Sequence, residues 1–166
     1  MPGPWGSPRA TLACARRELA HAGLHIVRAS RIYVTAPLGA GRQAPYLNAV
    51  LLLQGGLAPA AVLRLVKRIE RRAGRRFGRH WGPRRLDIDL LDHGGRRLGW
   101  PPWRRERGRL ILPHPEMHRR AFVLVPLLEV APHWRHPVFG ITARSLLGRI
   151  GQRERAGVRE ALDSAD

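Results

Sequence analysis

Two aspartates, Asp87 and Asp89, lie in the stretch RRLDIDLLD, whose other residues are mostly those of a buried strand. Side chains at positions i and i+2 of a strand point to the same face, about 7 Å apart along the strand. The two carboxylates would therefore face one spot, while Leu86, Ile88 and Leu90 face the other side. Carboxylates that share a spot repel each other, and flanking arginines, a raised pKa or bound cations relieve the repulsion. Oxygen ligands of this kind suit magnesium, whose coordination is commonly completed by substrate phosphates.

Alone, an Asp-x-Asp pair also fits a half-exposed strand whose polar face happens to carry two acids. The surroundings favour a cation site, because arginines gather within a dozen residues of the pair: Arg75, Arg76, Arg79, Arg84 and Arg85. A carboxylate pair beside a basic loop is typical of nucleotide chemistry that uses magnesium. The sequence contains no G-x-x-x-x-G-K-[ST] loop and no G-x-G-x-x-G turn after a strand, so ATP would be held by side chains and metal.

The charge balance of the chain is strongly basic. It carries 30 basic and 12 acidic residues, a formal net charge of +18, and Lys67 is its only lysine. Arginine favours two-point contact with phosphate or carboxylate, so the excess indicates polyphosphate or nucleic-acid partners, unless it only reflects a GC-rich genome. The single cysteine, Cys14, excludes an intrachain disulfide framework and a cysteine-based zinc site.

The location follows from what the sequence lacks. No run of about 18 consecutive apolar residues occurs, and the first residues, MPGPWGSPRA, do not have the layout of a signal peptide. We therefore expect a cytoplasmic protein with no membrane partner.

The first half of the chain predicts regular elements that would position the aspartates. Apolar periodicity and capping residues predict helices over 8–22 and 57–74. Residue types and turns predict strands over 24–35, 46–54 and 84–92, the first two forming a hairpin with a long loop. The order helix, strand, strand, helix, strand predicts an α+β fold: the ferredoxin-like βαββαβ sandwich with an antiparallel sheet, without its first strand.

The second half is less regular. We predict a surface excursion over 96–109, a short strand over 109–113 and a helix that begins near Thr142. With 166 residues and 44% apolar content, the chain has material for one domain. We assign this domain to residues 1–150 and a polar C-terminal tail to residues 151–166.

Four stretches resemble one known family. RHWGPRRLDIDLL and LILPHPEMHRRAFVLVPLLEVAP, together with YVTAPLG and APYLNAV, are similar to the motifs of 6-hydroxymethyl-7,8-dihydropterin pyrophosphokinase, an enzyme of folate biosynthesis. The resemblance covers about residues 5–150. It implies transfer of the β,γ-diphosphoryl group of ATP to the hydroxymethyl oxygen of the pterin, which leaves AMP. It also implies a monomeric enzyme whose partners are pterin and ATP.

The resemblance assigns residues to the phosphate side of the site. Asp87 and Asp89 match the aspartates that hold two magnesium ions in the family. Arg84 matches an arginine beside the phosphates, and Arg75 matches the loop arginine that joins it as a catalytic residue, although Arg76 and Arg79 are close alternatives. Two further positions match residues that contact ATP: His114 and Arg120.

The resemblance also assigns a pterin pocket. Tyr46 and Phe122 match the two aromatic residues that enclose the ring, and Asn48 matches the amide that reads its edge. The remaining pocket positions are two backbone contacts and a bordering ring: Thr35, Leu38 and Trp81. Glu70 matches a family glutamate to which we assign no role. Without the family, Tyr46 and Phe122 would fit core positions equally well.

One part of the family pattern is missing from the sequence. The family begins with an apolar strand that leads into a Gly-Ser-Asn or Gly-Ala-Asn turn, and Gly6-Ser7 does not match it because Pro8 follows. Our hypothesis is that the true start lies upstream, with Met1 inside the loop after that strand. The alternative is a truncated and inactive remnant of the enzyme.

A different class of function also fits the charge and the fold type: a non-catalytic RNA-binding ferredoxin-like module. Such modules carry several aromatic residues on one sheet face, in a motif similar to R-G-F-G-F-V-x-F, and the sequence has no such motif. We therefore expect no nucleic-acid partner.

Overall fold

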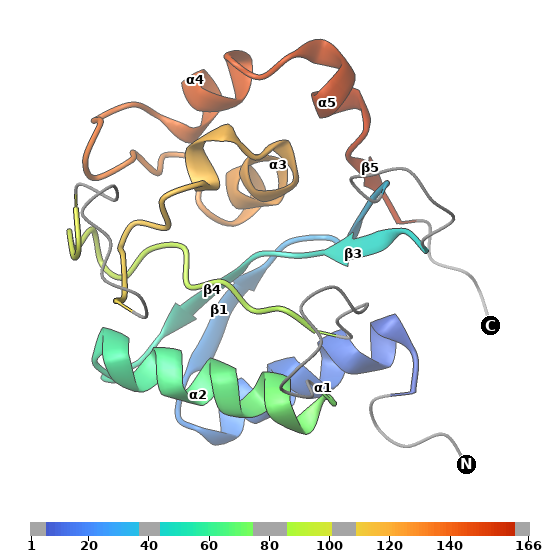
Figure 1. The fold of residues 1–166 in the computed structure, drawn as a ribbon, viewed down its shortest axis with the longest axis vertical. Helices are drawn as coiled ribbons and strands as arrows, with labels where there is room; N and C mark the ends of the chain where they lie inside the picture. The colour runs from blue at the N-terminus through green and yellow to red at the C-terminus, as the bar shows by residue number, and fades with distance from the viewer. Residues whose placement is uncertain (1–5, 37–43, 75–85, 101–108, 162–166) are drawn as a thin grey trace.

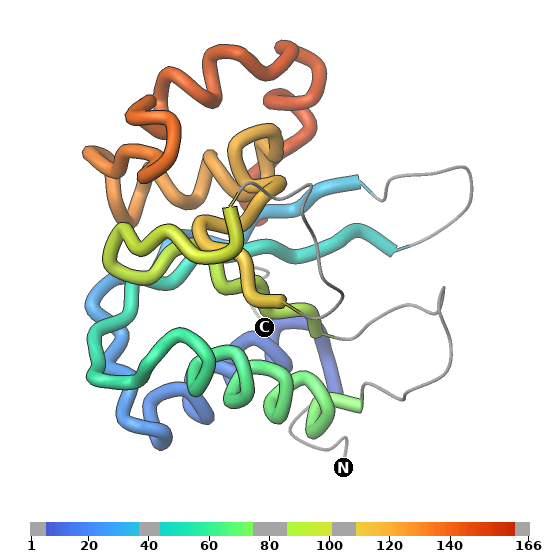
Figure 2. The backbone as a smooth tube through the Cα atoms, turned by 60° about the vertical axis from the view of Figure 1, so that its left-hand side comes forward, coloured from blue at the N-terminus to red at the C-terminus, as the bar shows by residue number. Residues whose placement is uncertain are grey.

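The computed structural model of the chain describes residues 6–36, 44–74, 86–100 and 109–161. Antiparallel strands lie between two groups of helices (Figures 1 and 2). The elements in chain order are α1 (Pro8–His21), β1 (His25–Ala29), β2 (Tyr33–Thr35), β3 (Tyr46–Asn48), β4 (Leu51–Gln54), α2 (Pro59–Arg72), η1 (Met117–Arg119), α3 (Ala121–Val130), α4 (Ala143–Gly148), α5 (Gln152–Ala156) and β5 (Arg159–Glu160). The fold is thus α+β with antiparallel pairing, as predicted at this level.

Helix α1 begins and ends where its capping residues predict. The side chain of Ser7 accepts a hydrogen bond from the backbone N–H of Ala10 at 3.2 Å, which satisfies one of the free donors of the first turn. Gly23 follows the helix with φ of +81°, a conformation that glycine adopts without strain. Ala15 and Leu19 are buried on the inner face, as the spacing predicts.

Helix α2 buries the predicted apolar stripe. Its inner face carries Val62, Leu65, Val66 and Ile69, all buried. These side chains form one core with residues of α1 and with Leu51 and Leu53 of β4. The helix therefore lies beside α1 on one side of the strands (Figure 1).

The predicted hairpin forms, but each of its strands is interrupted. β1 pairs with β4, and β2 pairs with β3, both antiparallel. At the interruption the backbone N–H of Ser30 donates to the carbonyl of Val50, and the N–H of Val50 donates to the Ser30 hydroxyl, both at 2.9 Å. Val50 packs in the core under α3, whereas Leu51 and Leu53 pack on the α1–α2 core. The strands break where the hairpin passes from one core to the other.

The prediction of a strand over 84–92 is wrong for the part that the structure describes. Residues 86–92 pair with no strand there, although their side chains alternate as expected. Leu86 is buried and Ile88 and Leu90 pack on the α1–α2 core, while Asp87 and Asp89 are exposed. A strand needs a neighbour to form a hydrogen-bonded ladder, and no described strand lies in register beside this segment.

The predicted strand over 109–113 is also wrong. Within the described part of the chain this segment forms only an isolated bridge, in which Leu98 and Leu112 exchange two backbone hydrogen bonds of 2.9 Å. The bridge between Leu98 and Leu112 joins the segment after residue 109 to the segment that follows the turn after residue 92, but it does not continue into a ladder.

The second core lies on the other side of the strands (Figure 2). The apolar run from 121 forms α3, whose residues Ala121 and Leu124 are fully buried. The predicted helix near Thr142 is α4, and the Thr142 hydroxyl caps it by accepting from the N–H of Ser145 at 3.1 Å.

The segment after residue 150 contributes to the sheet. Its helix α5 is followed by β5, which pairs antiparallel with β2 at Tyr33 and Val34. Among the described helices, none has the length and apolar character needed to cross a membrane.

Candidate active site

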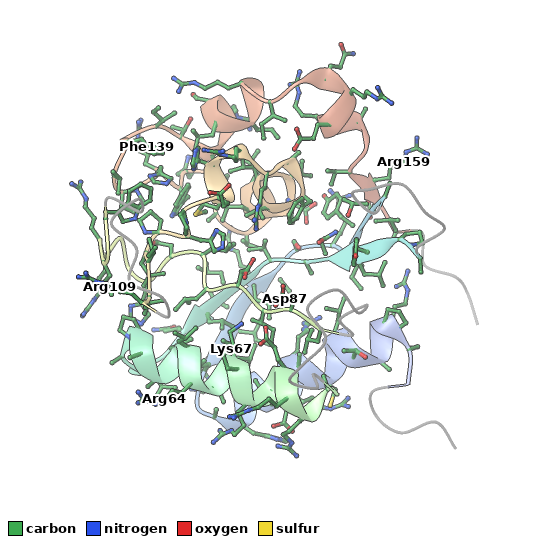
Figure 3. All side chains as sticks on the ribbon, viewed as in Figure 1. Arg64, Lys67, Asp87, Arg109, Phe139 and Arg159 are labelled. Carbon is green, nitrogen blue, oxygen red and sulfur yellow. The ribbon has the colours of Figure 1, made fainter. Side chains whose placement is uncertain are left out.

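The two aspartates lie on the segment that passes between α2 and α3, where Figure 3 places Asp87 near the middle of the molecule. Because Leu86 and Ile88 pack towards the α1–α2 core, the carboxylates point away from it. The alternation predicted from the sequence is therefore kept even though the segment forms no ladder. Among the described residues, no three His, Cys, Asp or Glu side chains gather closely enough to hold a metal by themselves.

Two basic groups face Asp89. Its Oδ2 lies 3.8 Å from Nε2 of His114 and 3.6 Å from Nη1 of Arg120. These contacts bring together residues that are far apart in the sequence. The structure thus brings one carboxylate together with two groups that carry N–H donors. That His114 and Arg120 contact ATP stays a prediction of the family resemblance.

The orientation of His114 is fixed by the backbone around it. Its own N–H donates to the carbonyl of Leu91 at 2.8 Å, which ties the turn to the aspartate segment. Its Nδ1 accepts from the N–H of Glu116 at 3.2 Å. A ring that accepts at Nδ1 carries its proton on Nε2 when neutral, so a donor faces Asp89.

Arg120 connects the anionic site with an aromatic ring. The residue is the N-cap of α3, and its guanidinium carbon lies 5.7 Å from the centre of the Phe122 ring. A guanidinium at this distance from a ring is held by cation–π attraction. Phe122 is half-buried against the second core, so one side of its ring is supported.

The polar pocket residues come from the β2–β3 pair. Thr35 lies opposite Tyr46, and the Asn48 amide donates to the Thr35 hydroxyl at 3.0 Å. A longer contact of 3.4 Å joins the same amide nitrogen to the carbonyl of Tyr46. Tyr46 is 45% exposed. Helix α3, which carries Phe122, contacts both strands.

A cluster of charged residues holds β2 against α3. The backbone N–H of Arg31 donates to Glu129 at 2.8 Å, its guanidinium donates to the same carboxylate at 2.7 Å, and the Tyr33 hydroxyl donates to it as well. Although burial opposes it, these hydrogen bonds lower the pKa of Glu129, and burial raises the pKa of Tyr33. No signal in the sequence indicates this cluster, because Glu129 lies about a hundred residues after Arg31 and Tyr33.

The family is decided by comparison with known proteins. The chain matches the family model of 7,8-dihydro-6-hydroxymethylpterin-pyrophosphokinase over residues 3–132. It belongs to this family.

Several curated relatives in the pyrophosphokinase family are similar over most of the chain. The 2-amino-4-hydroxy-6-hydroxymethyldihydropteridine pyrophosphokinase of Synechocystis is 39% identical over 129 residues, which are 78% of this chain and 62% of that protein. The protein of that name in Methylorubrum extorquens is 38% identical over 146 residues, 87% of each chain. The mitochondrial folate synthesis bifunctional protein of Arabidopsis thaliana is 36% identical over 92% of this chain and 28% of its own length. The chain thus spans less than two thirds of the Synechocystis relative.

Part of the site predicted from the pyrophosphokinase motifs lies outside the described residues. These positions are Leu38, Arg75, Trp81 and Arg84, with the alternatives Arg76 and Arg79. The other described positions that matched the motifs stand on three segments: the β2–β3 pair, the turn at 114 and the start of α3.

Glu70 is the residue whose role the sequence left open. Its carboxylate is fully buried, and Oε1 accepts a hydrogen bond of 2.8 Å from the backbone N–H of Ile88, between the two aspartates. Its position four residues after the buried Val66 was the available signal, because i and i+4 lie on one helix face. An acid on that face indicates a buried carboxylate with a specific partner.

Proposed function

We propose that the chain transfers the β,γ-diphosphoryl group of ATP to the hydroxymethyl oxygen of 6-hydroxymethyl-7,8-dihydropterin, within folate biosynthesis. The observation that carries the proposal is the approach of His114 and Arg120 to Asp89, at 3.8 and 3.6 Å, in a member of the pyrophosphokinase family. A carboxylate and two phosphate-binding groups meet there from separate segments, as a site for a metal-bound polyphosphate requires.

Magnesium fits the donor set of the aspartates. Asp87 and Asp89 offer exposed carboxylate oxygens, which are the hard donors that magnesium prefers. Since no group of three His, Cys, Asp or Glu side chains among the described residues could hold a metal, water and the phosphates of ATP would complete the coordination of two ions. The metal, when bound, neutralises charge on the phosphates during transfer.

The side chains around the aspartates would bind and orient the phosphates. Nε2–H of His114 and the guanidinium of Arg120 donate hydrogen bonds to phosphate oxygens, and charge-assisted bonds of this kind are strong. We propose the same role for Arg84, and for Arg75 as the loop arginine. Positioning and charge neutralisation dominate in such a reaction, which asks little of a general base.

The pterin would bind between Tyr46 and Phe122. A flat heterocycle gains dispersion and π contact from two rings, and its edge offers donors and acceptors to an amide. The Asn48 side chain is already oriented by Thr35, through the 3.0 Å hydrogen bond of its amide nitrogen. We propose that Thr35 and Leu38 add backbone contacts and that Trp81 borders the pocket.

For the fold, we propose the ferredoxin-like βαββαβ arrangement. The order of α1, the β1–β4 hairpin and α2 along the chain supports this arrangement. We further propose one domain over 1–150, a polar tail over 151–166, a monomeric state and a cytoplasmic location.

The test is AMP formation from ATP and magnesium, with and without 6-hydroxymethyl-7,8-dihydropterin. It is run on the chain as given and on a version extended upstream by an apolar strand. Pterin-dependent AMP in both versions supports the activity and shows that the strand is dispensable. AMP in the extended version alone supports the activity and the arrangement together, and AMP in neither overturns the proposal.

A further inference from the structure

Glu70 is a buried carboxylate on the inner face of α2, with 0% of its surface exposed. Its neighbours on that face are apolar, among them Val66 and Ile69. Taking a carboxylate out of water is unfavourable unless partners replace the lost hydration. A residue that adds only packing to this face would be apolar, so the contacts of Glu70 identify its role.

One partner compensates the charge. Lys67 Nζ lies 2.9 Å from Oε2 and 3.0 Å from Oε1 of Glu70, one turn earlier in the same helix. Lys67 is the only lysine in a chain with 30 basic residues. Its ammonium is a compact charge on a flexible stem, and the lysine side chain is 42% exposed, so the charge reaches the buried carboxylate from the surface.

The second partner belongs to the aspartate segment. Glu70 Oε1 accepts the N–H of Ile88 at 2.8 Å. This N–H belongs to the peptide group that joins Asp87 to Ile88. Holding that peptide plane therefore restrains the backbone from which both aspartate side chains project. The bond matters more here because residues 86–92 have no ladder with any described strand.

We propose that Glu70 is a positioning residue that fixes the direction and spacing of Asp87 and Asp89 through the peptide N–H of Ile88. This inference rests on the proposed function, since it assigns a role in the same magnesium and ATP site. A residue that fixes a metal-ligand backbone acts on metal affinity, whereas a residue that only packs acts on folding stability.

The experiment compares wild type with Glu70→Ala, Glu70→Gln and Val66→Ala. Glu70→Ala removes the acceptor, and Glu70→Gln keeps an amide oxygen that can accept from Ile88 while it loses the charge pair with Lys67. Val66→Ala is the matched control, because it opens a cavity on the same buried face one turn earlier and removes no hydrogen bond to Ile88. Amide exchange of Ile88 is measured by NMR, and magnesium and ATP binding by titration calorimetry without pterin.

In Glu70→Ala we expect the amide of Ile88 to exchange faster than other amides of similar burial. We also expect the magnesium affinity in the presence of ATP to fall by about ten-fold or more, which is the usual effect of losing an outer partner of a metal site. Glu70→Gln should keep the Ile88 amide protected and restore most of the affinity. Val66→Ala should lose stability while its magnesium affinity stays within about two-fold of wild type.

Two results would overturn the inference. One is a folded Glu70→Ala with wild-type magnesium affinity, and the other is a Glu70→Gln that keeps Ile88 protected but binds magnesium as weakly as the alanine variant. If Glu70→Ala does not fold, the test is the comparison of Glu70→Gln with Val66→Ala in Ile88 exchange and magnesium affinity. Because binding is measured without pterin, wild type that binds magnesium and ATP but forms no AMP overturns the proposed function and leaves the role of Glu70 standing.

Discussion

At the scale of single residues, the carboxylate of Asp89 is the centre of the proposed site. It is exposed, and its two basic neighbours lie at 3.6 and 3.8 Å, so its removal leaves no buried charge behind. We expect Asp89→Ala to lower kcat by at least about a hundred-fold, since metal and phosphate positioning supply most of the acceleration. The melting temperature should change little. Steady-state AMP formation and thermal unfolding test both points.

The matched control for Asp89 is Glu116→Gln, which removes the charge of a partly exposed acid that pairs with the exposed Arg119 at 3.6 Å. Exposed pairs of this kind contribute about 1 kcal/mol or less. The activity of this variant should equal that of wild type. An Asp89→Ala variant as active as Glu116→Gln would show that the assignment of the metal site is wrong.

The exposed ring of Tyr46 gives a second prediction at this scale. If it stacks on the pterin, Tyr46→Ala should raise the KM for the pterin by about ten-fold and leave the KM for ATP unchanged, because a lost ring contact costs about 1 kcal/mol beyond its area. Tyr46→Phe keeps the ring and should behave as wild type. A rise in KM of equal size for both substrates in the alanine variant would speak against a pterin contact.

At the scale of elements, the interruption between β1 and β2 decides where the pocket strands lie. Ser30 lies at this interruption, and its hydroxyl accepts a hydrogen bond of 2.9 Å from the N–H of the buried Val50. Ser30→Ala leaves that N–H without its acceptor and should lower the free energy of unfolding by about 1–3 kcal/mol. Urea unfolding measures the loss. Ser145→Ala, an exposed serine of α4, should stay within about 0.5 kcal/mol of wild type.

At the scale of the whole molecule, a buried histidine predicts sensitivity to acid. His136 is fully buried, and burial and then the charge of His118 lower its pKa to about 4 from 6.5, while Asp92 opposes the shift. Its Nδ1 accepts from the backbone of Val138 at 3.3 Å, and its ring stacks on Phe139 with centres 4.1 Å apart. The folded protein thus holds His136 neutral where the unfolded chain would protonate it.

Stability should therefore be complete above about pH 6.5 and fall as the pH decreases towards about 4, where the folded state also takes up the proton. The loss attributable to this residue is on the order of 3 kcal/mol. Urea unfolding at about pH 7 and about pH 5 should show about 2 kcal/mol of this loss, with His136→Phe as the comparison. A variant that loses as much stability between the two pH values as wild type would assign the acid sensitivity to other groups.

Much of the fold follows from local signals in the sequence. The helix ends were predictable because Ser7, Thr142 and Gly23 act on the backbone within a few residues of themselves. The inner face of α2 was predictable for a similar reason, since a periodicity of 3.6 residues determines which side chains share a face. The antiparallel hairpin and the alternation around the aspartates were also predictable, because they too depend on residues close in the sequence.

The family motifs predicted which residues belong to the site, but they did not predict which of these residues contact one another. They selected Asp89, His114 and Arg120, and the structure places His114 and Arg120 each within 4 Å of Asp89. The positions Leu38, Arg75, Trp81 and Arg84, which lie outside the described residues, stay predictions.

What only the tertiary structure decided are the relations between distant segments. The sequence determined by itself the helix caps, the buried faces and the residues that could do chemistry, because each depends on neighbours in the chain. It predicted ladders at 84–92 and 109–113, which fail because a strand requires a partner at the right distance and register. Likewise, the role of Glu70 emerges only where α2 lies against residues 86–92, since burial and a hydrogen bond to Ile88 are properties of packing and not of spacing along the chain.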